Sequence, residues 1–186
     1  NKECMWLYGI YLAEGSTYRG GIRFSLNASE IKYAEKIKEL LKLYFNKEAT
    51  VFYPKERENS IEVTCSSTEL ERAFSKTFGD GCENKIYPYV WNGLEKELCK
   101  YLMRGVWDGD GGKRSGMLEM TSRELISNLI DMVIRVGEVV PSLSIRHPKN
   151  KKTTYRLFLG KERINGFYDY IGETKYLFHR IERITK

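Results

Sequence analysis

The feature that most constrains the fold of this chain is an internal repetition of the signals that start and end helices. The spacing is 96 residues between Gly15 and Gly111, and 93 residues for Ser29 with Ser122, Ser67 with Gly160, and Gly79 with Gly172. Chance hardly supplies such a series, so we infer two copies of one unit, residues 1–92 and 93–186. The join falls within IYPYVWNG (86–93), where Pro88 and Gly93 interrupt regular structure.

Each copy alternates between helical and strand periodicity. Apolar residues recur at helical spacing in 30–45, 69–78 and 123–136, and they alternate with polar residues in 22–27, 60–66, 142–146 and 154–160. We expect Ser29, Ser122 and the Ser67–Thr68 region to cap helices, and Thr68 with Glu71 to form a capping box. The alternating segments predict half-buried strands that pack on helices through one face. Each copy therefore has the predicted order α-β-β-α-β-β-α, an α+β fold of two pseudo-symmetric repeats.

Composition limits the partners and the compartment. The net charge of +6, from 31 basic and 25 acidic residues, favours an anionic partner such as nucleic acid. The four cysteines lie far apart without a C-x-x-C pair, which argues against a zinc site or a disulfide framework and for a reducing compartment. No apolar run approaches the length of a membrane span. We expect an intracellular protein, in the cytoplasm or nucleoid of a prokaryote or in an organelle.

Two apolar stretches, LYGIYLAEG (7–15) and MRGVWDGDG (103–111), each read as a helix that stops at an acid followed by glycine. Small residues lie four apart in both, Gly9 with Ala13 and Gly105 with Gly109. Such spacing clears a flat strip along a helix, so that another backbone can approach closely. If the two helices pack along these strips, Glu14 and Asp110 lie side by side.

The expected position of these two acids is electrostatically unfavourable. A helix C-terminus carries partial negative charge, and two neighbouring carboxylates repel one another. A divalent metal ion held by Glu14 and Asp110, with phosphate oxygens completing its shell, would relieve this repulsion. An acid before a glycine is common at a solvated helix end, but its occurrence in both copies favours the metal site. Asp108 has no acidic counterpart in the first copy, where Leu12 stands, and we interpret it as structural.

The two stretches resemble the paired motifs of the LAGLIDADG homing endonucleases, and the resemblance covers nearly the whole chain. It implies two saddle-shaped antiparallel sheets over the DNA major groove, with the motif helices paired at the repeat interface. It also implies a monomer, without an obligate protein partner, that makes a staggered cut in both strands of a long target. The implied cofactor is Mg²⁺, as two or three divalent ions, with Mn²⁺ able to substitute and Ca²⁺ binding without cutting.

Carried over by position, the resemblance assigns Glu14 and Asp110 as the catalytic, metal-binding acids. The backbone carbonyls of Ala13 and Gly109 are implied as further metal ligands. The first copy has Glu14 where the family usually has Asp, a change that could weaken the cut of one strand.

The family also often places a lysine after the third helix of each copy, near the scissile phosphates. Lys85 and Lys175 are the corresponding catalytic candidates, although they lie 70 and 64 residues past Gly15 and Gly111 and so are not in strict register. A lysine at such a place could order water or offset the charge of the transition state.

DNA recognition is expected from polar strand faces and basic loops. The polar strand residues that could read base edges are Arg23, Ser25, Asn27, Glu62, Thr64, Glu119, Thr121, Ser142, Ser144, Arg146 and Arg156. The basic residues expected to contact phosphates are Arg19, Lys55, Arg57, Arg114, Lys149, Lys151 and Lys152.

Other interpretations remain open at the level of sequence. The same fold could bind DNA or RNA without cutting, as an RNA maturase or a DNA-binding regulator. A hydrolase that uses two carboxylates on a glycan is a third interpretation, which the basic polar strand faces disfavour. An intron, a free-standing gene or an intein could encode such an enzyme. The chain lacks the terminal residues needed for self-splicing, but it could be the endonuclease part of an intein.

Overall fold

The computed structural model describes residues 1–111, 116–137 and 140–159. The first copy comprises α1 (Lys2–Glu14), β1 (Gly15–Tyr18), β2 (Gly21–Asn27), η1 (Ala28–Glu30), α2 (Ile31–Phe45), β3 (Thr50–Phe52), β4 (Ser60–Ser66) and α3 (Thr68–Phe78). The join between the copies forms η2 (Tyr89–Gly93), and the second copy comprises α4 (Lys96–Asp110), β5 (Leu118–Met120), α5 (Arg123–Gly137), β6 (Ser142–Arg146) and β7 (Thr154–Phe158). The predicted α-β-β-α-β-β-α order is present in the first copy. The helix expected after Gly160 lies outside the described residues, and the boundary between 92 and 93 stays a prediction.

The first sheet is antiparallel, with the strand order β1-β2-β4-β3. Its register places Phe24 opposite Val63, and both side chains are fully buried against the helices. The neighbouring pairs, Arg23 with Thr64 and Ser25 with Glu62, therefore face away from the core. The alternation of apolar and polar residues in the sequence predicted this division into two faces, and it is confirmed in β2 and β4.

The second sheet is antiparallel, with the strand order β5-β7-β6. Leu118 and Leu157 lie opposite one another and are fully buried, because α5 packs on β5 and β7. The prediction of a half-buried strand is wrong for β6 among the described residues, since Leu143 and Ile145 are 47% and 54% exposed. Within the described residues, α5 packs on β5 and β7, whereas β6 lies beyond β7 at the edge of the sheet.

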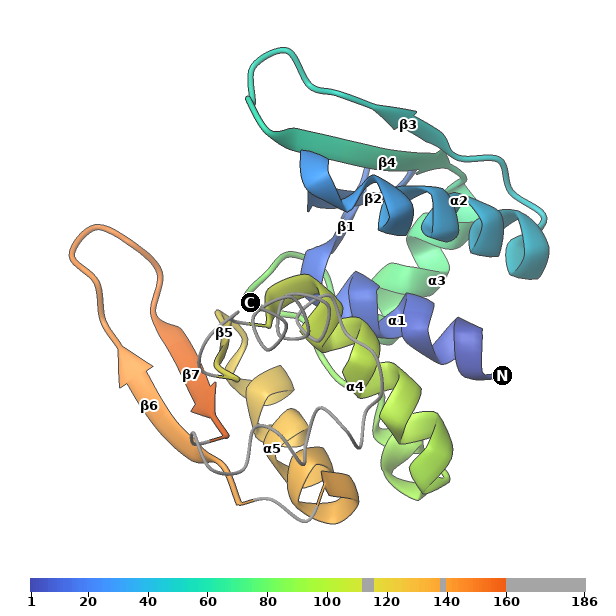
Figure 1. Cartoon of the computed structure of the whole chain (residues 1–186). Helices are drawn as coiled ribbons and strands as arrows, with labels where there is room; N and C mark the ends of the chain where they lie inside the picture. Colours follow the sequence, from blue (N-terminus) through green and yellow to red (C-terminus); the bar gives the residue numbers. More distant parts are fainter. Residues whose placement is uncertain (112–115, 138–139, 160–186) are drawn as a thin grey trace, which may run out of the picture.

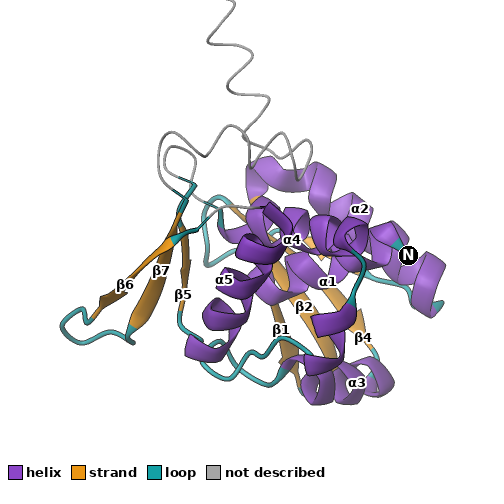
Figure 2. Cartoon of the chain, turned by 90° about the horizontal axis from the view of Figure 1, so that it is seen from below, coloured by secondary structure: helices purple, strands orange, loops and turns teal. Residues whose placement is uncertain are grey.

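The two helices that carry the acidic motifs, α1 and α4, lie against one another in the centre of the molecule. Figure 1 shows the first sheet on one side of this pair and the second sheet on the other, and Figure 2 shows the same arrangement from below. The core is built around these helices, and Trp6 and Trp107 are among its largest fully buried side chains. No helix in the described ranges has both the length and the apolar character needed to cross a membrane.

The helix starts differ in detail from the expected caps. Ser29 does not cap α2; it lies within η1, where the side chain of Asn27 accepts its backbone N–H at 3.0 Å. The cap of α3 is Ser67, which lies in the predicted Ser67–Thr68 region, but Glu71 accepts from the backbone N–H of Gly20 instead of closing the expected capping box. Local spacing identified the start regions, but neighbouring polar groups decided which side chain caps.

Ser122 and Gly79 behave as the sequence predicted. The Ser122 hydroxyl accepts the backbone N–H of Leu125 at 3.1 Å, and α5 starts at the next residue, Arg123. Gly79 ends α3 with a φ of 77°, a left-handed value that favours glycine.

Candidate active site

The α1 and α4 helices are in contact because glycines remove the side chains between them. A Cβ added to Gly9 would lie 2.1 Å from the carbonyl oxygen of Leu102, and one added to Gly105 would lie 2.2 Å from that of Trp6. Both distances are far below van der Waals contact, so no side chain fits at either place. The predicted packing of the two motif helices along their small residues is confirmed.

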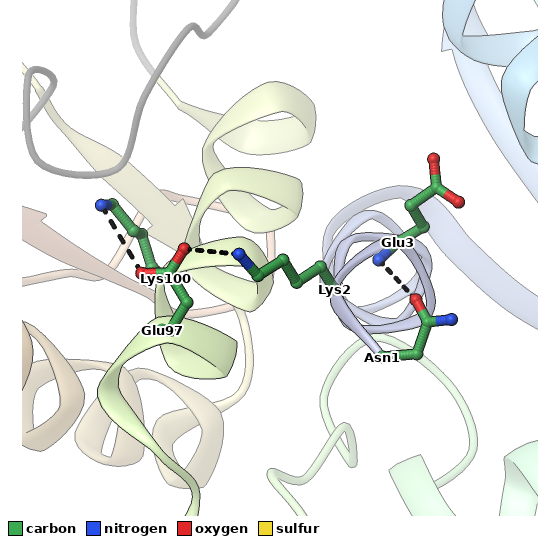
Figure 3. A network of polar contacts seen from close by, with 5 residues as sticks. All are labelled: Asn1, Lys2, Glu3, Glu97 and Lys100. Carbon is green, nitrogen blue, oxygen red and sulfur yellow. Dashed lines mark hydrogen bonds and ion pairs between the residues drawn. The ribbon is translucent and has the colours of Figure 1, made fainter.

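The two helices run in the same direction. At their N-terminal ends, the Lys2 ammonium pairs with Glu97 at 3.0 Å, and Glu97 also pairs with Lys100 at 3.8 Å, as Figure 3 shows. At the other end, a Cβ on Gly109 would lie 2.4 Å from the Cβ of Ala13. The C-terminal ends of α1 and α4 are therefore neighbours. The exposed Lys2 pair adds little stability, since solvent screens it.

The acidic residue of the first motif lies against the second motif. The same virtual Cβ on Gly109 would lie 3.1 Å from Cγ of Glu14, so the Glu14 side chain passes directly beside the end of α4. Asp110 is the last residue of that helix, and both acids are partly exposed. The two terminal acids thus share one location at the join of the helix ends.

Lys85 places a positive charge at this join. Its ammonium donates to the last carbonyls of α1, those of Tyr11, Leu12 and Ala13, at 3.1, 2.8 and 3.2 Å. Burial lowers the pKa of Lys85 to about 8, although the charges of Asp110 and Glu14 act in the opposite direction. A single ammonium therefore interacts with both carboxylates and with a helix end of partial negative charge.

The loop that carries Lys85 is held by the second copy. The Ser122 hydroxyl donates to the carbonyl of Lys85 at 2.6 Å, and the Thr121 hydroxyl donates to that of Cys82 at 2.8 Å. Lys152 adds an ion pair to Glu83 at 3.0 Å. The position of Lys85 therefore depends on residues that follow β5 and on the connection between β6 and β7.

Asp108 is buried between the helices and serves as an acceptor. Its two carboxylate oxygens accept from the indole N–H of Trp6 at 2.8 Å and from the hydroxyl of Tyr33 at 3.0 Å. Asp108 is only 1% exposed, which agrees with the structural role proposed from the sequence. Sequence reasoning did not find its partners, because Trp6 and Tyr33 read as ordinary apolar helix positions.

The carbonyl of Ala13, an expected metal ligand, accepts a hydrogen bond from Lys85. Among the residues that the structure describes, no group of three or more His, Cys, Asp or Glu side chains is placed to hold a metal ion. The metal-ligating atoms at this place are those of the Glu14 and Asp110 carboxylates and of backbone carbonyls. These atoms are all oxygens, which fit the preference of Mg²⁺ and Ca²⁺, and the Lys85 ammonium shows that this place accommodates a cation.

Most of the residues expected to contact DNA lie on the outer faces of the sheets or in the connecting loops. Register places Ser144, Arg156 and Glu119 in one row across the second sheet, and Arg146 beside them opposite Thr154. The remaining basic residues lie in the strand connections, namely Arg19 between β1 and β2, Lys55 and Arg57 between β3 and β4, and Lys149, Lys151 and Lys152 between β6 and β7. Ser142 is exposed at the start of β6.

Several of these expectations need correction. Glu62 is only 6% exposed, and the Arg57 guanidinium lies 3.4 Å from its carboxylate. Asn27 uses its side chain to cap η1, and Thr121 lies beyond β5 and binds the Lys85 loop. Arg114 and Lys175 lie outside the described residues.

Comparison with protein-family models finds no match. The chain is 30% identical over 145 residues to an uncharacterised protein of Methanocaldococcus jannaschii, a match that covers 76% of this chain and 18% of that protein. It is 31% identical over 113 residues to the ATP-dependent DNA helicase Hel308 of Thermococcus kodakarensis, covering 60% of this chain and 10% of the helicase. The chain thus spans less than a fifth of the length of either relative.

Solved structures resemble the chain over nearly its whole length. The homing endonuclease I-DmoI in complex with DNA and Ca superposes with a TM-score of 0.67 at 12% identity, covering 98% of this chain and 97% of I-DmoI. Full-length WhiA from Thermatoga maritima superposes with a TM-score of 0.62 at 16% identity, covering all of this chain and 60% of WhiA. At these identities the likeness establishes the fold alone. This chain has the LAGLIDADG fold, as its two acidic helices indicated.

Proposed function

We propose that this chain is a site-specific DNA endonuclease of the LAGLIDADG type, which makes a metal-dependent staggered cut in a long double-stranded target. One observation carries the proposal. The C-terminal ends of α1 and α4 meet, with Glu14 against Gly109 and with the Lys85 ammonium influenced by both Glu14 and Asp110. A structural role alone does not account for two acids at helix ends, where the helix dipole disfavours them.

The chemistry divides between a divalent ion and the residues of the chain. A bound Mg²⁺ ion would supply Lewis-acid stabilisation and an activated water for phosphodiester hydrolysis. Glu14 and Asp110 would hold it, with the carbonyl of Gly109 and, once Lys85 releases it, that of Ala13. Lys85 would keep a positive charge close to the phosphate on which negative charge develops. Mn²⁺ is proposed as a substitute, and Ca²⁺ as an ion that supports binding only.

The outer faces of the two sheets would contact the DNA. Figure 1 shows the two sheets on either side of the α1–α4 pair, so a duplex along their outer faces would cross the acids. Loop lysines and arginines would position the duplex through its phosphates, and strand residues would read bases. Both acids belong to one chain, so a monomer suffices.

Two further observations bear on the compartment of the proposed enzyme and on the kind of gene that encodes it. All four cysteines are free, which supports our proposal of an intracellular enzyme. Both curated relatives carry the matching segment within a much longer protein, and one of them is a DNA helicase. We propose an association with an intron or an intein, and these long relatives support the intein arrangement.

A second candidate function is nucleic-acid binding without cleavage. The observation in its favour is the match to the N-terminal LAGLIDADG domain of WhiA, with a TM-score of 0.62 over 95% of this chain. That structure carries the name of the LAGLIDADG domain but not that of an endonuclease. The Lys85 hydrogen bond to the carbonyl of Ala13 also favours it, since this bond occupies an expected metal ligand.

The test begins with selection of bound duplexes from random DNA in Ca²⁺, followed by their transfer to Mg²⁺. The proposed endonuclease enriches one long shared sequence and cuts both strands at fixed positions. Glu14→Gln and Asp110→Asn should keep the affinity measured in Ca²⁺ and lower the cleavage rate by roughly 100-fold or more, the usual scale for groups that stabilise transition-state charge.

Glu3→Gln is the matched control for the two acidic variants, because it neutralises an acid at the opposite end of α1. Its cleavage rate should equal that of the unchanged chain. A shared sequence that is bound but left intact in Mg²⁺ would contradict the endonuclease and support the binding function.

A further inference from the structure

Arg156 occupies the centre of the outer face of the second sheet. It lies on β7, the middle strand, opposite Glu119 of β5 and Ser144 of β6. The next residue, Leu157, is fully buried on the opposite face. Since successive side chains of a strand alternate between faces, Arg156 points to the side where the DNA is proposed to lie.

The Arg156 guanidinium is hydrogen-bonded to the carboxylate of Glu119, which also accepts a hydrogen bond from Thr154. Its Nε–H donates to Oε2 of Glu119 at 2.9 Å, and the Thr154 hydroxyl donates to Oε1 of the same residue at 2.6 Å. Burial raises the pKa of Glu119, but these two hydrogen bonds and the charge of Arg156 outweigh it, so the pKa lies below its ordinary value of 4.5. Glu119 is therefore a charged acceptor at neutral pH, and both of its oxygens are engaged.

This arrangement leaves one edge of the guanidinium for a ligand. Among the described residues, the hydrogen bonds of the Arg156 side chain involve only Nε. Its two terminal nitrogens form a planar pair of donors, and the ion pair limits the rotamers that the side chain can adopt. In the DNA major groove, the partner that offers two matching acceptors is guanine, through O6 and N7.

We infer that Arg156 reads a guanine in the half of the target that the second sheet contacts, and that Glu119 and Thr154 are positioning residues for it. This inference rests on the proposed binding of duplex DNA and names a base contact within that interface.

Two other arginines, Arg57 in the connection between β3 and β4 and Arg146 on β6, lack this geometry and provide controls. Arg57 reaches Glu62 through Nη1, at 3.4 Å, so its terminal edge is already used, and its side chain is 62% exposed. Arg146 lies on the exposed edge strand β6, opposite Thr154. Arg57→Gln removes the same charge from the first sheet, and Arg146→Gln removes it from the face that holds Arg156.

The test repeats the selection of duplexes in Ca²⁺ with the unchanged chain, Arg156→Gln, Arg156→Lys and Glu119→Gln. The unchanged chain should prefer guanine at one position by roughly 5- to 150-fold, the range for a bidentate base contact. Arg156→Gln should abolish that preference. Arg156→Lys should retain only part of it, because an ammonium lacks the planar pair of donors. Glu119→Gln should weaken the guanine preference at the same position, whereas Arg57→Gln and Arg146→Gln should leave that preference unchanged.

A second measurement uses the unchanged chain and does not depend on how the variants fold. Each guanine of the selected duplex is replaced in turn by 7-deazaguanine, which lacks the N7 acceptor, and the affinity is measured in Ca²⁺. One replacement should lower the affinity of the unchanged chain and have no further effect on Arg156→Gln.

The outcomes separate the two proposals. If the unchanged chain enriches no shared sequence, the proposed function fails. A shared sequence in which Arg156→Gln keeps every guanine preference, or in which no 7-deazaguanine lowers affinity, overturns the role of Arg156 and leaves the proposed function intact.

Discussion

The C-terminal ends of α1 and α4 carry the same kind of motif but are stabilised in different ways. At the end of α1, an ammonium from Lys85 binds the last carbonyls of the helix, and Leu12 lies in the core. In the last turn of α4, the position equivalent to Leu12 is Asp108, a buried carboxylate that accepts from Trp6 and Tyr33. One end is therefore stabilised by a buried cation, and the other contains a buried anion.

The contacts that support each helix end also cross between the two copies. Lys85 belongs to the first copy, but its backbone carbonyl is held by Ser122 of the second. Asp108 belongs to the second copy, but Trp6 and Tyr33, which donate to it, belong to the first. Each helix end thus depends on residues of the other copy. The polar contacts that join the copies differ between the two helix ends, so they do not follow the symmetry of the repeats.

The largest expected effect on stability tests a feature that α1 and α4 share, the close backbone contact at their glycines. Gly105→Ala should lower the free energy of unfolding by about 3 kcal/mol, since its Cβ would lie 2.2 Å from the carbonyl oxygen of Trp6 and backbone atoms cannot move aside cheaply. Urea denaturation measures the change. Gly93→Ala is the matched control, because a Cβ there meets nothing within 4 Å, and it should have little effect. Equal denaturation midpoints for both variants would contradict close packing of α1 on α4.

A smaller effect on stability tests the difference between the two helix ends, by giving α4 the leucine that α1 has at the equivalent position. Asp108→Leu should lower the free energy of unfolding by about 2 kcal/mol, because it leaves the buried N–H of Trp6 without its acceptor. Tyr33→Phe should be destabilising in the unchanged chain and nearly neutral in the Asp108→Leu background, since its partner is then already absent. Additive changes in the urea midpoints would show that the Tyr33 hydroxyl and Asp108 are not coupled.

The smallest effect on stability tests the support of Lys85 by the second copy. Ser122→Ala should lower the free energy of unfolding by about 1 kcal/mol through loss of a helix cap. It should also reduce the cleavage rate in Mg²⁺ by about 10-fold, the lower range for residues that orient a metal site, without changing DNA affinity in Ca²⁺. Ser67→Ala removes the cap at the N-terminal end of α3, where the hydroxyl accepts from Leu70, whereas the Lys85 loop follows the other end of this helix, so cleavage should be unchanged. Similar cleavage by the two variants would argue against Ser122 as a support for Lys85.

Much of the fold could be predicted from the sequence, because the determining signals are local. The four-residue spacing of Gly9 with Ala13 and Gly105 with Gly109 is sufficient to indicate a close helix pair, and the structure has that pair. The alternation in β2 and β4 indicated which side chains face the core, since a strand has a period of two. The clustering of the two terminal acids followed from the same helix geometry.

Tertiary structure alone decided which residues meet over long separations. Periodicity tells which face of a strand a residue occupies but not what packs on that face, so the burial of Glu62 beside Arg57 and the exposure of Leu143 were not predictable. The acceptors of the Lys85 ammonium lie more than seventy residues away along the chain, as does the Tyr33 partner of Asp108. By itself, the sequence indicated the elements of the first copy, the faces of β2 and β4, and the two acids that end α1 and α4. Packing determined the neighbours of those acids, because the partners of a buried charge depend on how the elements fit together.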